Sequence, residues 1–205
     1  MATTCPLNLD LDQLRGQVGA TYTRLAQDAD GDFHFHKGID YACDVLGYDR
    51  VELESLPAAS TSRFAGLGNP LRIGPVSPGE TVLDIGSGAG TDLMLAARRT
   101  GPTGKAIGVD ATEAMRECAA QSAADAGLAM IIELREGRAE SLPVDDASVD
   151  VVISNGVVNL TPDKSDAFRE IARVLRPGGR LHLADVVLAT ELSEASRADA
   201  DLWAA

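Results

Sequence analysis

The sequence predicts an α/β fold in which helices cover both faces of a parallel sheet, and three observations support this. Between residues 81 and 189, apolar runs typical of buried strands alternate with segments of helical periodicity. The first run, at 81–85, leads directly into a glycine-rich turn and then into a helix. The second run ends at an acidic residue, Asp110. We therefore expect a ligand cleft at the carboxyl edge of the sheet.

The helices and strands of this region can be assigned from their periodicity and their end signals. The helix after the glycine turn covers residues 91–99. The next has Thr112 as its expected N-cap and ends at Gly127. The last begins at Thr161-Pro162, with proline in its first turn, and stops at Pro177-Gly178-Gly179. The strands are expected at residues 81–85, 105–109, 130–134, 149–154 and 180–188.

The first part of the chain is expected to be helical. A short helix is predicted at 37–46, and another opens at Asp49 with Glu52 at capping-box spacing. Residues 57–78, rich in Ala, Ser, Gly and Pro, are expected to form a connecting loop. A longer helix precedes them, and its apolar stripe consists of Leu11, Leu14, Val18, Tyr22 and Leu25.

Most aromatic residues precede the first strand of the sheet. This distribution favours a lid that closes over the cleft, or alternatively a helical segment that needs large side chains for a small core of its own. We therefore divide the sequence into a helical N-terminal lid with its connecting loop, residues 1–78, and a sheet domain that binds the ligand, residues 79–205.

The composition narrows the classes of function and partner. A net charge of −13 argues against nucleic acid, which would require a basic face. No apolar run approaches the roughly 20 residues of a membrane helix, and the first ten residues lack the features of a secretory signal. The three cysteines suit neither a disulfide framework nor a zinc site. We expect a cytoplasmic protein without a membrane partner, and a solvated charged face at Arg169, Glu170 and Arg173 of the last helix.

The glycine turn distinguishes two classes of nucleoside ligand. Dinucleotide dehydrogenases require G-x-G-x-x-G, whereas the glycines here are Gly86, Gly88 and Gly90, and Thr91 follows them. Asp84, just before the turn, suits a ligand with an ammonium group better than a pyrophosphate, which an acid would repel. The pattern therefore disfavours NAD.

The motif that begins at Asp84, together with Asp110 and the later Pro-Gly-Gly turn, resembles the class I S-adenosylmethionine-dependent methyltransferases. The resemblance implies a Rossmann-like doubly wound sheet, mainly parallel, with strand order 3-2-1-4-5, and S-adenosylmethionine as cofactor. It also implies that Asp110 holds the ribose and that Arg138 and Ala139 lie beside the adenine. The residues that it assigns to the cofactor site are Tyr22, Asp84, Gly86, Ser87, Gly88, Gly90, Asp110, Ala111, Arg138, Ala139, Asn155 and Gly156.

A closer resemblance, to arsenite methyltransferases and their relatives, covers most of the chain. It rests on stretches such as YDRVELESLP, GLGNPL, VDVVISNGVVNLTPDK and LRPGGRLHLADVVL, and on a helix whose tyrosine, here Tyr22, closes over the cofactor in that family. That family holds arsenic with cysteines, since a soft metalloid prefers sulfur. Leu67 and Gly156 stand at two of those positions, and the third would follow Ala205. Cys43 is more simply explained as a small buried hydrophobe, so we expect no metal site.

The predicted catalytic residues are Tyr22, His34, His36 and Asn155. An aromatic face near the sulfonium would stabilise it by a cation–π interaction, and Tyr22 is assigned that role. The two histidines, at i and i+2, would face the same side of an extended segment. Either would serve as a base or touch the substrate, unless both are structural. Asn155, at the end of the fourth strand, would lie where cofactor and substrate meet.

The sequence therefore predicts a methyltransferase that acts on a small-molecule acceptor. The alternatives are a cofactor-binding domain that is catalytically impaired or truncated and, less favoured, an NAD-dependent oxidoreductase. No C-terminal hairpin follows Ala189 in the sequence, which would leave the fifth strand as an exposed edge. Either the sequence is truncated or the edge is covered, for example in a homodimer.

Overall fold

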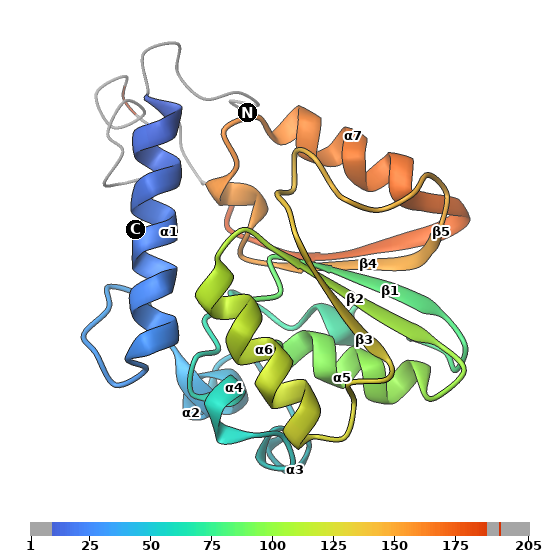
Figure 1. The fold of residues 1–205 in the computed structure, drawn as a ribbon, viewed down its shortest axis with the longest axis horizontal. Helices are drawn as coiled ribbons and strands as arrows, with labels where there is room; N and C mark the ends of the chain where they lie inside the picture. The colour runs from blue at the N-terminus through green and yellow to red at the C-terminus, as the bar shows by residue number, and fades with distance from the viewer. Residues whose placement is uncertain (1–9, 188–192, 194–205) are drawn as a thin grey trace.

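The computed structural model describes residues 10–187 and residue 193. Its centre is a sheet in which all neighbouring strands run parallel, in the order β3-β2-β1-β4-β5 (Figure 1). This confirms the Rossmann-like doubly wound sheet and its strand order. The strands are β1 Thr81–Ile85, β2 Lys105–Asp110, β3 Ile132–Glu136, β4 Val149–Asn155 and β5 Leu175–Ala184.

Helices cover both faces of the sheet. The helices α5 (Thr91–Thr100) and α6 (Glu113–Asp125) lie on one side, and α7 (Lys164–Val174) lies on the other (Figure 1). Right-handed crossovers explain this arrangement, because the chain moves from β1 towards β3 at one edge and from β4 to β5 at the other. The reversal at β1 and β4 leaves a crevice at the carboxyl ends of these strands.

The N-terminal segment is helical, as expected, and its second half is more regular than expected. Asp49 caps its helix as predicted, accepting a hydrogen bond of 2.9 Å from the backbone N–H of Glu52. Residues 57–78, expected to be a loop, contain two short helical elements, because local turns satisfy their backbone groups. The elements are α1 Leu11–Gln27, α2 Gly38–Asp44, α3 Arg50–Glu54, α4 Ala58–Thr61 and the 3₁₀ turn η1 Pro70–Arg72.

Two buried clusters fill the two faces of the sheet. On the α5 side, Val82 and Ile153 belong to a cluster that also contains Phe64 of the N-terminal segment. On the α7 side, Leu83 packs in a cluster with Ile171. Successive strand residues point to opposite faces, which is why neighbours such as Val82 and Leu83 join different clusters. The N-terminal segment shares the core of the sheet, and the division at residues 78 and 79 stays a prediction.

A third cluster joins α1 to α6, which lie side by side in Figure 1. Its buried centre includes Leu25 and Met115, and Tyr22, Phe33 and Phe35 pack against it. The aromatic residues of the N-terminal segment therefore serve two purposes. Some enter the core of the sheet, and the others attach α1 beside the crevice.

β2 and β4 each end one residue later than expected, at Asp110 and Asn155, and β3 and β5 differ more. β3 begins at Ile132 rather than at residue 130, because buried Leu128 closes the turn after α6 and leaves Met130 97% exposed. β5 spans Leu175–Ala184 rather than 180–188, since the strand continues through the Pro-Gly-Gly turn, where its register against β4 shifts. Residue 188 lies outside the described residues.

The helices α6 and α7 differ in how their ends are capped. α7 begins at Lys164 rather than at the expected Thr161-Pro162, because Asp163 accepts hydrogen bonds from the next backbone N–H groups. Thr112 precedes α6 as expected, but its side chain makes no cap hydrogen bond. Gly127 ends that helix as expected, with φ at +70°.

No helix in the described part of the chain is long and apolar enough to cross a membrane. The strand β5 lies at one edge of the sheet. The segment after Ala189, where the absence of a hairpin is expected, lies outside the described residues. The homodimer through this edge stays a prediction.

Ile153 of β4, which is fully buried, tests the packing of the central sheet. We expect Ile153→Ala to lower the free energy of unfolding by about 2–5 kcal/mol, because it leaves a cavity in the cluster on the α5 side of the sheet. Met130→Ala, at a side chain that is 97% exposed, should change it by less than about 0.5 kcal/mol. Urea denaturation measures both, and similar effects for the two variants would contradict the assigned packing.

Candidate cofactor-binding cleft

The crevice at the carboxyl edge of the sheet is a cleft of about 660 Å³. The ends of β1, β2 and β4 form one part of its wall. Further parts come from α1, residues 63–66, the first turns of α5 and α6, the segment after β3 and residues 157–162. The sequence-predicted residues that line the cleft are Tyr22, Asp84, Gly86, Ser87, Gly88, Asp110, Ala111, Arg138, Ala139, Asn155 and Gly156.

The other predicted site residues, Gly90, His34 and His36, are not among the residues that line the cleft. A Cβ atom on Gly90 would lie 3.2 Å from the Cβ of Ala119, so this glycine allows α5 and α6 to pack closely. The ring of His34 packs edge-on against Phe35, and the ring of His36 stacks on Tyr41. The geometry therefore gives these three residues packing contacts and does not support their assigned roles.

Two glycines of the turn are needed for different reasons. A Cβ atom on Gly86 would lie 2.3 Å from Cγ2 of Val157, so only glycine lets the segment after β4 approach the turn. Gly88 has φ at +51° and lines the cleft, and a Cβ atom there would have no neighbour within 4 Å. A side chain at this position would therefore enter the space that a ligand needs.

Asp110, at the end of β2, is fixed by two backbone groups. Its Oδ2 accepts a hydrogen bond of 2.8 Å from the N–H of Gly88, and its Oδ1 accepts one of 2.8 Å from the N–H of Thr112. A carboxylate can accept about four hydrogen bonds, so each oxygen retains capacity for a ligand hydroxyl. The residue is thus held in one orientation at the cleft wall without being saturated.

Three carboxylates lie close together in this part of the cleft: Asp84, Asp92 and Asp110. Burial raises the pKa of Asp84 well above its ordinary value, and the charges of Asp92 and Asp110 raise it further. Burial also raises the pKa of Asp92 and of Asp110, although hydrogen bonds to each carboxylate oppose this. The cleft is therefore built for a cation and is unfavourable for a pyrophosphate.

Tyr22, on α1, contributes an aromatic face and a neutral hydroxyl. Its ring stacks on Phe35 with the centroids 6.1 Å apart. Burial, together with the charges of Asp110 and Asp185, raises the pKa of its hydroxyl to about 12. The phenol therefore stays protonated near neutral pH and does not add negative charge to the cleft.

The side chain of Asn155 is occupied by protein contacts. Its Oδ1 accepts hydrogen bonds of 2.7 and 3.0 Å from the N–H groups of Leu67 and Gly68. Its Nδ2 lies 2.9 Å from both the Gly68 carbonyl and Oδ2 of Asp92. The network ties the loop at residues 66–69 to the end of β4. Asn155 therefore lies at the cleft, as predicted, with its polar atoms directed to that loop.

Two members of this network, Asp92 and Tyr48, were not predicted from the sequence. The hydroxyl of Tyr48 donates a hydrogen bond of 2.6 Å to Oδ1 of Asp92 and lies 3.2 Å from Nδ2 of Asn155. Both side chains are buried. Asp92 was detectable as an acid in the first turn of a helix that also carries the ligand turn. Tyr48 had no local signal, because its partners are distant in sequence.

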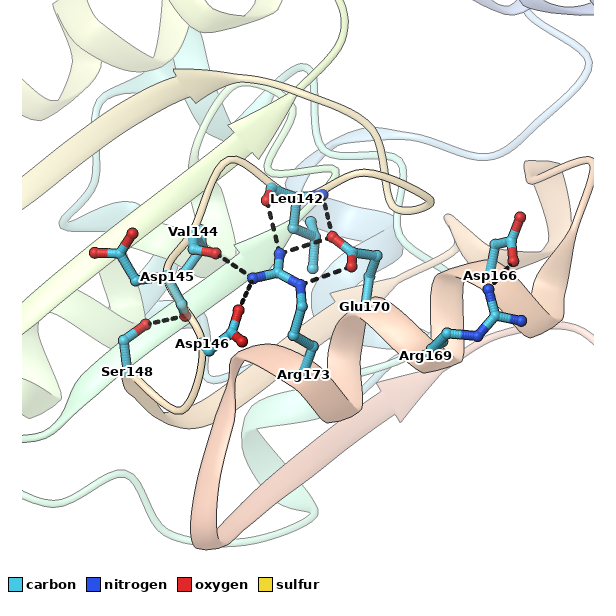
Figure 2. A network of polar contacts seen from close by, with 9 residues as sticks. All are labelled: Leu142, Val144, Asp145, Asp146, Ser148, Asp166, Arg169, Glu170 and Arg173. Atoms are coloured by element: carbon cyan, nitrogen blue, oxygen red, sulfur yellow. Dashed lines mark hydrogen bonds and ion pairs between the residues drawn. The ribbon is translucent and has the colours of Figure 1, made fainter.

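The contacts of the charged residues of α7 were also not predicted. Glu170 and Arg173 of α7, expected to form a solvated face with Arg169, instead bond to the segment at residues 137–148 (Figure 2). That segment carries Arg138 and Ala139 to the cleft. Periodicity placed the charged side chains on the outer face of the helix but could not show which segment covers them.

Asn155→Ala should lower the free energy of unfolding by about 1–3 kcal/mol, because it leaves the buried groups that it bonds without partners. We also expect faster hydrogen exchange at the amides of Leu67 and Gly68. Asn69→Ala is the matched control, since Oδ1 of Asn69 is buried and has no hydrogen-bond partner in the described part of the chain. Unfolding in urea and amide exchange measure the two effects. Unchanged exchange at residues 67 and 68 would exclude the proposed tether.

The known proteins that this chain resembles include methyltransferases. A family described as a methyltransferase domain matches residues 76–205. The arsenite methyltransferase of Halobacterium salinarum is 40% identical, over 94% of this chain and 52% of that protein. The arsenite methyltransferase of Mus musculus is 30% identical, over 95% of this chain and 53% of that protein. The chain therefore spans about half the length of these curated relatives.

Solved structures agree with the fold. The crystal structure of an arsenic(III) S-adenosylmethionine methyltransferase from Chlamydomonas reinhardtii has a TM-score of 0.66 and 36% identity, over 72% of this chain and 51% of that one. A methyltransferase from Aquifex aeolicus, at 23% identity and a TM-score of 0.54, covers 73% of each chain and shares the fold. The chain therefore belongs to the methyltransferase-domain family, as a class I S-adenosylmethionine-dependent type similar to the arsenite methyltransferases.

Proposed function

We propose that this protein transfers a methyl group from S-adenosylmethionine to a small-molecule acceptor. The observation that carries the proposal is the carboxylate of Asp110, fixed by the N–H groups of Gly88 and Thr112 and still able to accept hydrogen bonds. A ribose with two adjacent hydroxyls matches the acceptor capacity that remains. The open space at Gly88 leaves room for the rest of the nucleoside.

The charge of the cleft fits the same cofactor. S-adenosylmethionine carries an ammonium and a sulfonium group, and the buried carboxylates of Asp84 and Asp92 and the partly buried carboxylate of Asp110 line the part of the cleft beside the glycine turn. A cation there offsets the mutual repulsion of the acids. We assign Asp84 and Gly86–Gly88 to the amino-acid end of the cofactor, Asp110 and Ala111 to the ribose, and Arg138 and Ala139 to the adenine.

The cofactor supplies an activated methyl group, and the protein supplies orientation and a dry cleft. We assign the aromatic face of Tyr22 to the sulfonium, because its ring lies at the cleft and its hydroxyl stays neutral. His34 and His36 lie away from the cleft lining, so the proposal includes no histidine base. An acceptor with a free lone pair, such as a sulfur or an activated carbon, needs none.

Gly156 of the cleft wall is covered by an apolar side chain, that of Leu67, which does not itself line the cleft. Leu67 packs over Gly156, where a Cβ atom would lie 3.0 Å from Cγ of Leu67. These are the two positions at which the resemblance to arsenite enzymes implies cysteines. Cys43 and Cys118 are not among the residues that line the cleft, and no metal-binding group of His, Cys, Asp or Glu occurs among the described residues. We propose an organic acceptor bound by apolar contact rather than arsenite bound by thiolates. We further infer a cytoplasmic location, because Cys43 and Cys118 are free cysteines and free thiols persist in a reducing compartment.

A methylation assay tests the acceptor proposal with a panel of arsenite, small thiols and phenols, each supplied with S-adenosylmethionine. Turnover of a thiol or phenol supports the proposal, and rapid arsenite turnover would contradict it. Cofactor binding without turnover of any acceptor would favour the impaired or truncated domain. Calorimetry with S-adenosylhomocysteine and NAD separates the remaining alternative, because NAD binding without binding of the thioether would indicate an oxidoreductase.

Asp110→Ala tests the ribose contact. We expect it to weaken S-adenosylhomocysteine binding by about 1–3 kcal/mol, because the ribose hydroxyls lose their acceptor. Asp125→Ala, at an exposed acid of α6 that bonds only to Gln121 among the contacts described for its side chain, is the matched control and should bind normally. Isothermal titration calorimetry measures both, and equal affinity in the two variants would remove the assigned role of Asp110.

Asp84 should make cofactor affinity depend on pH. In the free protein its pKa is raised by burial and by neighbouring acids, and a bound cation lowers that pKa. The complex therefore binds fewer protons than the free protein, so affinity should rise as pH rises through the raised pKa. Calorimetry in buffers of different ionisation enthalpy should detect proton release on binding.

The Asp84→Asn variant provides the control for this pH dependence. We expect it to show a weaker pH dependence than the wild type, since Asp92 and Asp110 remain. We also expect it to weaken binding by about 1.5–3 kcal/mol, the usual contribution of a hydrogen bond to a charged group. The free variant should be more stable than the wild type at alkaline pH, because a buried acid with a raised pKa destabilises the fold once it ionises. A pH-independent wild-type affinity would show that Asp84 does not pair with the ligand cation.

A further inference from the structure

The segment at residues 137–148, which we call the β3–β4 segment, crosses from the cleft to the outer face of α7. At the cleft end, Arg138 and Ala139 line the wall, and the N–H of Gly137 donates a hydrogen bond of 3.3 Å to the Asp110 carbonyl. Further along, Leu142 and Val144 are buried in the cluster on the α7 side. One stretch of backbone therefore joins the adenine side of the cleft to a helix on the far side of the sheet.

The β3–β4 segment contains no helix or strand of its own beyond an isolated bridge between Arg138 and Ser141. Its carbonyl groups therefore need partners outside regular secondary structure. The guanidinium of Arg173 supplies them. Its Nη2 donates to the Leu142 carbonyl at 2.9 Å, and its Nη1 donates to the Val144 carbonyl at 2.8 Å.

The remaining N–H groups of Arg173 are also used (Figure 2). Nε and Nη2 form a bidentate pair with Glu170, with both N–O distances at 2.7 Å, and Nη1 reaches Oδ1 of Asp146 at 2.7 Å. An arginine side chain has five N–H donors, and these contacts account for all of them. Lysine cannot reproduce this arrangement, because it has three donors and no planar fork.

Glu170 completes the attachment from the other direction. Its Oε2 accepts a hydrogen bond of 2.8 Å from the N–H of Leu142, the residue whose carbonyl Arg173 binds. The pair therefore holds both backbone groups of one residue. The backbone carbonyl groups at the end of α7 add two further bonds, from Ala147 N–H to Arg173 and from Ser148 N–H to Val174.

We propose that Arg173 is a positioning residue for cofactor binding, which fixes the β3–β4 segment so that Arg138 and Ala139 meet the adenine. Arg173 lies on α7, behind the sheet, and acts through the backbone of residues 142–144. The inference rests on the proposed function, since it concerns the adenine end of the same cleft. Its consequence is specific: loss of Arg173 should reduce the contribution of the base to affinity more than that of the rest of the ligand.

Arg169 is a matched control on the same helix. Its side chain is 72% exposed, and among the described residues it pairs with Asp166 of its own helix (Figure 2). Arg169→Met and Arg173→Met remove the same charge and the same hydrogen-bonding group. Only the second releases the β3–β4 segment.

The experiment measures binding of S-adenosylhomocysteine and of S-ribosylhomocysteine, which lacks the base, to the wild type and both variants. The contribution of the base is reported by a ratio: the dissociation constant of S-ribosylhomocysteine divided by that of S-adenosylhomocysteine. We expect Arg173→Met to weaken S-adenosylhomocysteine binding about tenfold and to change S-ribosylhomocysteine binding little, so that the ratio falls. Arg169→Met should keep the wild-type ratio, and Arg173→Lys should give an intermediate one.

The outcomes separate this inference from the proposed function. If the wild type binds S-adenosylhomocysteine and Arg173→Met keeps the wild-type ratio, Arg173 has only a structural role and the inference is wrong. If the wild type does not bind S-adenosylhomocysteine, the proposed function itself fails. Should Arg173→Met not fold, Arg173→Lys decides the question: a lowered ratio in the folded Lys variant supports the inference, and an unchanged ratio overturns it.

Discussion

The burial of several carboxylates at one edge of a parallel sheet is the constraint on which the cleft depends. Asp84 and Asp92 are almost inaccessible to solvent, and ionised acids in such surroundings are costly unless other groups compensate. The protein compensates with the backbone N–H of Leu93 in α5, which bonds to Asp84, and with the side chains of Tyr48 and Asn155, which bond to Asp92. The compensation is incomplete, since the pKa of each acid remains raised. A cationic ligand supplies what is missing, so the same charges that disfavour the empty cleft favour its proposed cofactor.

Side chains on strands and helices hold the irregular segments of the cleft in place. Asn155, at the end of β4, binds the backbone of the loop at 66–69. Arg173, on α7, binds the backbone of the β3–β4 segment. In both cases the polar group bonds to main-chain atoms, so the tether depends little on the side chains of the loop. Precision at a ligand site then comes from strands and helices, even where loops form the contact surface.

The sheet and the part of the cleft at the glycine turn were predictable from sequence because their signals are local. The apolar run of β1, the glycine turn and Asp110 lie close together in the chain and need no tertiary information. The roles of Asn155, Tyr48 and Arg173 were not predictable, because their partners lie far away in sequence: Tyr48 and Asp92 are separated by 44 positions. The roles assigned to the two histidines stay predictions. Their residue type suggested catalysis, but aromatic neighbours hold them away from the cleft lining.

These contacts also locate where acceptor specificity can reside. The carboxylates and Asp110 belong to the cofactor side, and Asn155 is committed to the loop that it holds. Few groups near the end of β4 are therefore left to recognise an acceptor. They include Val157 and Leu160 after β4 and the face of α1, which lines the cleft with Arg15, Val18 and Tyr22. If the acceptor is apolar, as we propose, these contacts select it mainly by shape and burial.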